Sequence, residues 1–180
     1  MSDTLRIREV RQAKRLKAVE LAEAAEISAP FLSQLERGLV DPSLETLRRI
    51  SRALDVPLFS LFAEAKDEHT VSVIRSGQET TIRSPDGSLV YKRKSHTVAD
   101  LEVLAVTMLP RSESRDALWS HEAEECIVVM SGDLVVETSA GVYALAPGDS
   151  CHYDSRLPHR FVNKSDQRVE FLISVTPPSY

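Results

Sequence analysis

Three residues in the second half of the chain have the types and spacing of a metal site or a polar-ligand site. His121 and Glu125 lie four residues apart in a strand-like segment, and His159 lies in a later segment of the same kind. Because side chains alternate along a strand, His121 and Glu125 share a face, and His159 completes the group from another strand. Two histidines and a carboxylate hold zinc or ferrous iron with open coordination positions. In a metal-free pocket they instead hydrogen-bond a small polar ligand or one another, and the sequence leaves both interpretations open.

Other side chains are candidates for the wall of the same pocket. Trp119 lies two residues before His121, so on a strand both side chains are expected to point to the same face. Taken singly, the remaining candidates also suit structural or solvent-facing positions, because strands place alternate residues outside. The predicted effector pocket comprises Tyr91, Met108, Trp119, His121, Glu125, Tyr153 and His159, and its predicted metal ligands are His121, Glu125 and His159.

A different chemistry is indicated at the N-terminal end, where basic residues gather. Among the first seventeen residues, six basic side chains outnumber two acidic ones and leave a net charge of +4. The basic residues are Arg6, Arg8, Arg11, Lys14, Arg15 and Lys17. Such an end can face phosphates, and the alternative is a solvated helix face.

The composition sets limits on the class of protein. The 180 residues are 42% hydrophobic and 27% charged, which excludes a disordered or collagen-like chain. The net charge of −5 argues against indiscriminate coating of nucleic acid. No run approaches the roughly 18 apolar residues of a membrane helix, and the start lacks the apolar core of a signal peptide. We therefore predict a cytoplasmic protein without a membrane partner, which two cysteines outside any CxxC pair also fit.

The hydrophobic pattern changes from helical to strand-like spacing near residue 66, which predicts two domains. We expect a helical domain over 1–63, a linker over 64–70 and a β domain over 71–180. The predicted helices lie near 3–15, 18–25, 29–37, 43–54 and 57–62, with Ser28 and Ser43 capping the third and fourth. Strands are predicted near 71–75, 79–83, 88–94, 101–109, 117–121, 125–131, 133–138, 142–146, 149–153, 159–163 and 168–175. So many short strands favour a closed sandwich or barrel.

The block over 19–62, VELAEAAEISAPFLSQLERGLVDPSLETLRRISRALDVPLFSLF, resembles the helix-turn-helix domain of the XRE family. The matching residues are Leu21, Ala22, Ile27, Ser28, the run LSQLERG over 32–38, Pro42, Ser43, Leu44 and Leu47. The resemblance implies a five-helix bundle whose third helix enters the major groove of DNA. It places at the DNA Lys17, Ala29, Pro30, Phe31, Ser33, Gln34 and Arg37, with Arg11 as a further phosphate contact.

Two departures from the XRE pattern affect this implication. The family often has glutamine at the start of the second helix, where this chain has Lys17 and Ala18. It usually has glycine where Glu26 stands in the turn, so we expect Glu26 to adopt a positive φ at a cost of about 1 kcal/mol. For Phe31, core packing is the alternative to DNA contact.

Residues 121–163 resemble a cupin domain, a double-stranded β-helix of jelly-roll type. The two cupin motifs are matched at His121, Glu125, Gly132, Gly148, His159 and Asn163. Trp119 replaces the first motif histidine, and further departures are Glu113, Asp154 and Arg156. The family's usual site of three histidines and one glutamate has therefore lost a ligand. The sequence does not decide between a metal site and a metal-free pocket.

The two resemblances together imply a bacterial regulator that binds an operator in double-stranded DNA as a homodimer and senses a small-molecule effector in its cupin barrel. We expect repression rather than catalysis. The alternatives are a metal-dependent cupin dioxygenase or isomerase with an accessory helix-turn-helix, and a helix-turn-helix that docks another protein. The acidic residues suit a cationic amine, whereas the histidines and Arg156 suit a carboxylate, so the effector class stays open.

Overall fold

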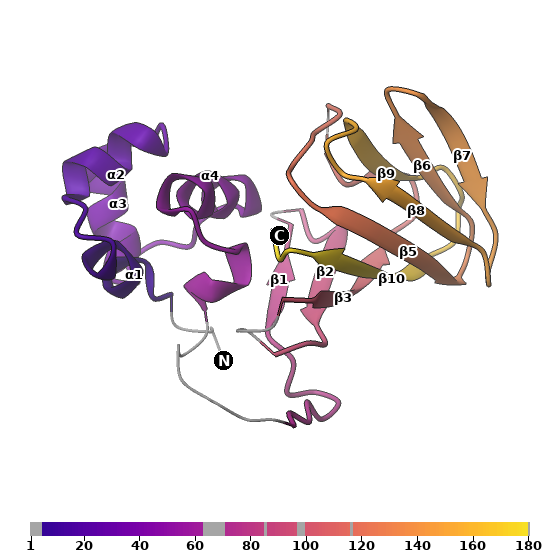
Figure 1. The fold of residues 1–180 in the computed structure, drawn as a ribbon, viewed down its shortest axis with the longest axis horizontal. Coiled ribbons are helices and arrows are strands. Elements are labelled where there is room, and N and C mark those ends of the chain that lie inside the picture. Colours follow the sequence, from indigo (N-terminus) through magenta and orange to yellow (C-terminus); the bar gives the residue numbers. More distant parts are fainter. Residues whose placement is uncertain (1–4, 63–70, 85, 97–99, 116, 180) are drawn as a thin grey trace. The chain divides into compact units, whose positions relative to one another are not determined.

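The computed structural model describes residues 5–62, 71–84, 86–96, 100–115 and 117–179. The chain splits into two compact units, the second of which is Val71–Ser179 (Figure 1). The predicted linker over 64–70 lies outside the described residues. Among the helices that the structure describes, none is long and apolar enough to cross a lipid bilayer.

The N-terminal unit is built from short helices. These are α1 (Ile7–Ala13), α2 (Ala18–Ala24), α3 (Ala29–Glu36), α4 (Leu44–Leu54) and the 3-10 helix η1 (Leu58–Leu61). The prediction of five α-helices is therefore wrong for the described residues, because the segment predicted over 57–62 is a 3-10 helix. Its N–H groups donate three residues back, from Ser60 to Pro57 at 3.0 Å and from Phe62 to Phe59 at 3.1 Å. A segment this short, with Pro57 at its cap, favours that tighter pattern.

The predicted starts of α3 and α4 are confirmed. The Ser28 hydroxyl accepts from the Phe31 N–H at 3.3 Å, and the Ser43 hydroxyl accepts from the Thr46 N–H at 3.1 Å. Each cap satisfies a backbone donor that the first helical turn leaves without a partner. Local sequence thus fixes where the predicted recognition helix α3 begins.

The helices enclose one apolar interior, as their periodicity predicted. The buried side chains that they contribute include Ile7, Leu21, Ala22, Ala25, Leu32, Leu35, Leu44, Leu47, Ile50, Leu54, Leu58, Phe59 and Leu61. Ile27, which matches the XRE pattern, is half-buried at the turn between α2 and α3. One face of α3 is consequently fixed against the other helices.

The second unit is made of antiparallel strands. They are β1 (Thr81–Arg83), β2 (Leu89–Arg93), β3 (Glu102–Met108), β4 (Ser112–Glu113), β5 (Glu124–Ser131), β6 (Leu134–Thr138), β7 (Gly141–Leu145), β8 (Ser150–Asp154), β9 (His159–Asn163) and β10 (Val169–Thr176). They form a six-stranded sheet in the order β1-β2-β3-β10-β5-β8 and a four-stranded sheet in the order β4-β9-β6-β7 (Figure 1).

The prediction of a closed barrel is wrong for the described strands, because both sheets are open at their edges. Side-chain packing joins the sheets instead of a continuous ring of hydrogen bonds. Phe161 on β9 and Phe171 on β10 pack with ring centroids 5.3 Å apart. The interior between the two sheets is therefore a sandwich core.

Two predicted strands are absent from the described residues, and one short strand was not predicted. The segment 71–75 has no regular structure, and Val71 and Val73 are exposed despite their alternation. The segment 117–121 makes only an isolated bridge, between Trp119 and His159. The two-residue strand β4 pairs with β9, and a pair so short leaves no periodic pattern in the sequence.

Two residues of the cupin motifs have clear structural reasons. Gly132 has a φ of 73°, and a Cβ added there would lie 2.6 Å from the Arg168 carbonyl oxygen. The side-chain amide of Asn163 is buried and donates to the carbonyls of Leu109 at 2.9 Å and Gln167 at 2.7 Å. Gly132 thus fits the tight turn between β5 and β6, and Asn163 ties the end of β9 to the segments next to β3 and β10.

Candidate functional site

The solvent-exposed face of α3 carries most of the predicted base-contacting residues. Side chains at spacings of three and four form this stripe: Pro30, Ser33, Gln34 and Arg37. Such spacings align side chains on one helix face. Leu32 and Leu35 are buried on the other face. Ala29 and Phe31 are half-buried, so Phe31 both packs and keeps an accessible edge.

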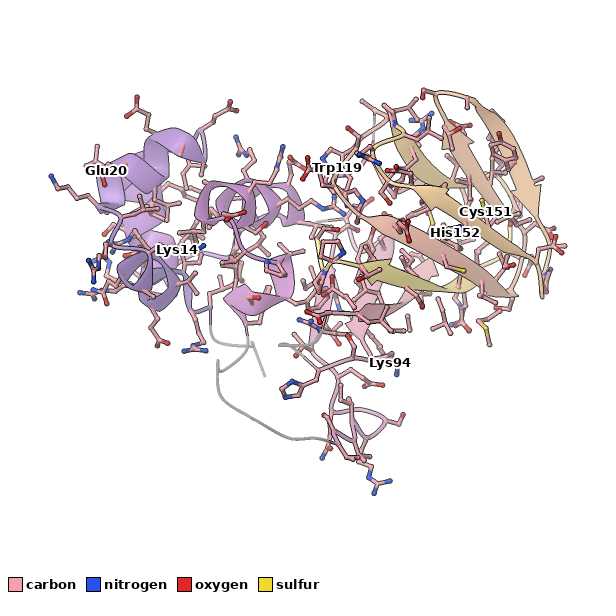
Figure 2. All side chains as sticks on the ribbon, in the orientation of Figure 1. Lys14, Glu20, Lys94, Trp119, Cys151 and His152 are labelled. Carbon is pink, nitrogen blue, oxygen red and sulfur yellow. The ribbon has the colours of Figure 1, made fainter. Side chains whose placement is uncertain are left out.

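Two of the predicted phosphate contacts, Lys17 and Arg37, are accessible to solvent. Lys17 is exposed at the N-cap of α2, where its backbone N–H donates to the Glu20 carboxylate at 2.7 Å. Arg37 is exposed, and its Nε donates to the Ser33 carbonyl at 3.0 Å. Figure 2 shows Glu20 on α2 and Lys14 at the end of α1. Lys17 and Arg37 can therefore present positive charge to a DNA backbone.

Arg11 has a different role from the predicted phosphate contact. Its Nε and Nη2 donate to the Glu36 carboxylate at 2.7 and 3.0 Å, and its Nη1 donates to the Leu16 carbonyl at 2.9 Å. The Arg11 side chain is only 12% exposed, and Glu36 raises its pKa. The guanidinium thus ties α1 to α3 inside the unit.

The second candidate site is a cluster of polar side chains in the β unit. The Nε2 of His121 lies 2.7 Å from Oε1 of Glu125, and the Nε2 of His159 lies 3.7 Å from that same oxygen. The Tyr153 hydroxyl donates to Oε2 of Glu125 at 2.8 Å. Glu125 and His159 are buried, and the structure brings these side chains together in the interior of the unit.

Backbone pairing explains how segments far apart in the chain meet there. Glu125 lies on β5 opposite Tyr153 on β8, so their side chains share a face. The N–H of Trp119 donates to the His159 carbonyl at 3.0 Å, and the reverse bond is 2.9 Å. The His121 N–H donates to the Ser155 carbonyl at 3.0 Å. Figure 2 shows Trp119 beside the strands of this unit.

Two partners of the histidines were not predicted. The Nδ1 of His159 donates to the Leu157 carbonyl at 2.9 Å, so in the neutral ring Nε2 carries the lone pair. The Ser179 hydroxyl lies 2.7 Å from Nδ1 of His121. The Leu157 contact is local in sequence, but Ser179 is 58 residues from His121 and no sequence signal connects them.

Aromatic rings cover one side of the cluster. The Trp119 indole stacks on the His121 imidazole with centroids 4.2 Å apart and planes at 20°. The Arg115 guanidinium lies 4.1 Å from the Trp119 ring centroid. Trp119 therefore packs on the histidine, although it stands where the cupin motif has a further ligand. Arg115 was not predicted, and its cation–π contact has no local sequence signature.

Burial and neighbouring charges set the protonation of the cluster. Burial acts to raise the pKa of Glu125, but the close contact with His121 and the charges of both histidines hold that pKa below its usual value. Burial lowers the pKa of His159. Burial, followed by the charge of Glu125, raises the pKa of Tyr153. The buried carboxylate is thus ionised, with a neutral phenol and a histidine that resists protonation around it.

Other predicted pocket residues lie elsewhere. Tyr91 on β2 and Met108 on β3 are buried, and β10 separates β3 from β5 in the sheet. They belong to the packed interior of the six-stranded sheet. Arg156, considered as a carboxylate partner, is exposed and donates from Nε to Asp154 at 3.0 Å. Burial raises the pKa of the Cys151 thiol on β8, where Figure 2 shows it beside His152, so a reactive thiolate is disfavoured.

The cluster fits a divalent metal ion. One ligand atom from each of His121, Glu125 and His159 lies within 4.8 Å of the others. The Leu157 carbonyl fixes the His159 tautomer that binds through Nε2, as carbonyl partners do in many metal sites. Without a metal, Tyr153 hydrogen-bonds Oε2 of Glu125, whereas Nε2 of His121 and Oε1 of Glu125 lie 2.7 Å apart as an ion-pair contact that lacks hydrogen-bond geometry.

Comparisons with protein families agree with this division of the chain. Residues 7–61 match the helix-turn-helix family model, and residues 105–175 match the cupin domain model. The HTH-type transcriptional regulator PuuR of Escherichia coli K12 is 23% identical over 176 residues, which cover 97% of this chain and 95% of that protein. The HTH-type transcriptional regulator SinR of Bacillus subtilis is 31% identical over 98 residues, which cover 54% of this chain and 88% of that protein.

Solved structures share the fold. An HTH_3 family transcriptional regulator from Vibrio cholerae superposes with a TM-score of 0.72 at 22% identity, over 96% of this chain and 93% of that chain. The hydroxypropylphosphonic acid epoxidase from S. wedmorenis superposes with a TM-score of 0.52 at 20% identity, over 97% of this chain and all of that chain. At these identities the likeness shows the fold alone, and the same architecture carries both a regulator and an enzyme.

Proposed function

Because this chain belongs to the HTH-type transcriptional regulators, we propose that it binds an operator as a homodimer through α3 and senses a small molecule in its β unit. Two α3 helices of such a dimer would meet half-sites one helical turn apart. Repression follows where the operator overlaps a promoter. Sedimentation analysis of the full chain tests the dimer.

The exposed stripe on α3 is the observation that supports operator binding. Gln34 presents an amide, the group that pairs with adenine in the major groove, and Ser33 presents a hydroxyl. Pro30 and Ala29 lie at the helix start, the part that lies nearest the bases in this type of domain. Lys17 and Arg37 add charge for the phosphates.

Selection of duplexes from a random library tests operator binding. We expect one enriched sequence with two half-sites. Gln34→Ala should relax the preference at one base pair by about 1–3 kcal/mol, because it removes a base contact. Lys17→Ala should weaken all sequences alike and lower the salt slope by about one. Gln78→Ala, exposed in the β unit, is the matched control. Failure to enrich any sequence, with and without metabolites, contradicts the proposal.

The polar cluster supports sensing in the β unit. Glu125 and His159 are buried, yet they present ionisable groups to the interior between the sheets. Thermal shifts of the full chain with a panel of amines and carboxylates would identify the ligand class. A true effector should also change operator affinity, because a ligand shifts only an equilibrium whose states it binds differently. Stabilisation that persists in Glu125→Gln would contradict a role for this cluster.

The same cluster supports a second candidate function, metal-dependent cupin catalysis. His121, Glu125 and His159 would hold zinc or ferrous iron, which supplies Lewis acidity or oxygen chemistry when bound. Tyr153 would orient the carboxylate through its hydrogen bond. Elemental mass spectrometry on untagged protein, beside His121→Ala and His159→Ala, tests the site. Stoichiometric metal that both variants lose, together with oxygen uptake on a substrate, favours the enzyme. Metal-free protein favours a sensing pocket.

A further inference from the structure

The turn between α2 and α3 contains a residue in a conformation that side chains usually avoid. Glu26 has a φ of 54°, in the left-handed region that favours glycine. Its N–H donates to the Glu23 carbonyl at 3.0 Å, and the Ile27 N–H donates to the Ala22 carbonyl at 2.9 Å. These two bonds form a Schellman motif, which requires the left-handed residue at this position. Glu26 is therefore held there by the way α2 ends.

Arg49 on α4 reaches the same turn. Its Nη1 donates to the Glu26 carbonyl oxygen at 3.1 Å and lies 3.9 Å from Oε2 of the Glu26 side chain. The Arg49 side chain is 30% exposed, whereas that of Glu26 is 83% exposed. The contact with the backbone carbonyl is the closer of the two and is the one with hydrogen-bond geometry. A guanidinium on this carbonyl restrains the backbone of Glu26 from outside the turn.

We propose that Arg49 is a positioning residue for DNA recognition, which holds the left-handed turn at Glu26 and thereby fixes the direction in which α3 starts. Ser28, the N-cap of α3, follows Glu26 by two residues, so a change in the Glu26 dihedrals moves the start of α3 directly. The inference rests on the proposed function, because it concerns how α3 meets DNA. In this role Arg49 acts on the turn and makes no contact with phosphate.

Four variants of the full chain test the role. Arg49→Met removes the guanidinium but keeps most of the aliphatic length, and Glu26→Gly removes the backbone strain. The double variant reports whether the two effects are coupled. Arg52→Met is the matched control, since Arg52 lies on α4 and its contacts, with the Glu45 carboxylate and the Arg48 carbonyl at 3.4 Å each, lie within that helix. The DNA probe is the duplex that the wild-type chain enriches from a random library.

We expect Arg49→Met to weaken binding of that duplex about 5–30-fold, because fewer molecules hold α3 in the competent arrangement. The slope of affinity against salt should not change, and binding of random duplex should change little. In the Glu26→Gly background the loss should shrink, because glycine keeps the left-handed conformation unaided. Arg52→Met should bind as the wild type does.

Three results would overturn the inference: an unchanged affinity in Arg49→Met, an equal loss in the glycine background, or a salt slope lowered by about one. The last result would make Arg49 a phosphate contact. Hydrogen exchange at the Glu26 and Ile27 amides provides a readout that needs no DNA, and Arg49→Met should accelerate it while Arg52→Met does not. If the wild type selects no duplex, operator binding fails, and the exchange rates alone decide whether Arg49 holds the turn.

Discussion

The ion pair between Arg11 and Glu36 makes the helical unit sensitive to a single substitution. The pair joins α1 to α3 through two donor nitrogens at 2.7 and 3.0 Å, and the side chains are 12% and 9% exposed. Breaking a fully buried pair costs about 3–5 kcal/mol, whereas an exposed pair contributes about 0–1. Both side chains are mostly shielded, and Arg11→Met leaves the Glu36 carboxylate without its partner. We therefore expect this substitution to lower the free energy of unfolding by about 2–3 kcal/mol.

Thermal unfolding of the full chain, followed by the helical circular dichroism signal, measures this cost. A loss of about 2–3 kcal/mol corresponds to a midpoint lowered by about 8–20 °C for a unit of this size. Glu36→Gln should cost about 1 kcal/mol, because its amide oxygen still accepts from Arg11. Arg11→Met combined with Glu36→Leu should cost less than the sum of the separate changes, since no charge is left without its partner.

Two outcomes would refute the reasoning. A cost below about 0.5 kcal/mol for Arg11→Met would mean that the pair behaves as an exposed one despite its burial. Additive costs in the double variant would mean that Arg11 and Glu36 do not stabilise each other. The ion pair gives the Arg11 side chain a structural role that does not involve DNA. Arg11→Met should therefore leave the salt dependence of operator affinity unchanged in the folded fraction.

Three further predictions concern the β unit. Hydrogen bonds from the Ser84 hydroxyl and the Ser88 backbone lower the pKa of Asp86 to about 2, so its folded pKa lies below the unfolded one. Its stabilising effect is therefore present at neutral pH and lost as pH falls through about 4 toward about 2, and Asp86→Asn should flatten the acid limb of melting curves. Asn163→Ala removes a buried amide that donates to the Leu109 and Gln167 carbonyls and accepts from the Ser165 N–H, so it should lower the free energy of unfolding in urea by about 2–4 kcal/mol, whereas the exposed Gln78→Ala should be neutral. Gly132→Ala combines a positive φ with a clash at the Arg168 carbonyl, so it should lower the melting midpoint or abolish folding.

The features that sequence predicted correctly are local ones. The caps at Ser28 and Ser43 depend on a hydroxyl three residues before a backbone N–H, and the positive φ of Glu26 depends on how one helix ends. His121 and Glu125 meet as predicted, although His121 precedes β5 and lies outside any strand. Each of these relations spans a few residues, where chain geometry alone determines which groups meet.

The features that sequence missed depend on distant partners. Arg11 meets Glu36 across 25 residues, and the resemblance that made Arg11 a candidate phosphate contact gave no sign of an acidic partner on another helix. His121 meets Ser179 across 58 residues. The open sheets were missed for the same reason, because closure depends on whether the outer edges of β7 and β8 pair, and strand patterns do not encode it.

The bonding within the polar cluster limits which ligand can enter it. Oε1 of Glu125 lies 2.7 Å from Nε2 of His121 without hydrogen-bond geometry, and Oε2 accepts from Tyr153, so each carboxylate oxygen already has a polar neighbour. A ligand that displaces His121 must give the buried carboxylate a donor or a positive charge, since an unpaired buried carboxylate costs several kcal/mol. A carboxylate ligand adds a second negative charge beside Glu125, and Arg156, which could have neutralised it, is exposed and bound to Asp154. We therefore expect a ligand of this cluster to be a metal ion or a cationic or donor-rich molecule rather than a simple carboxylate.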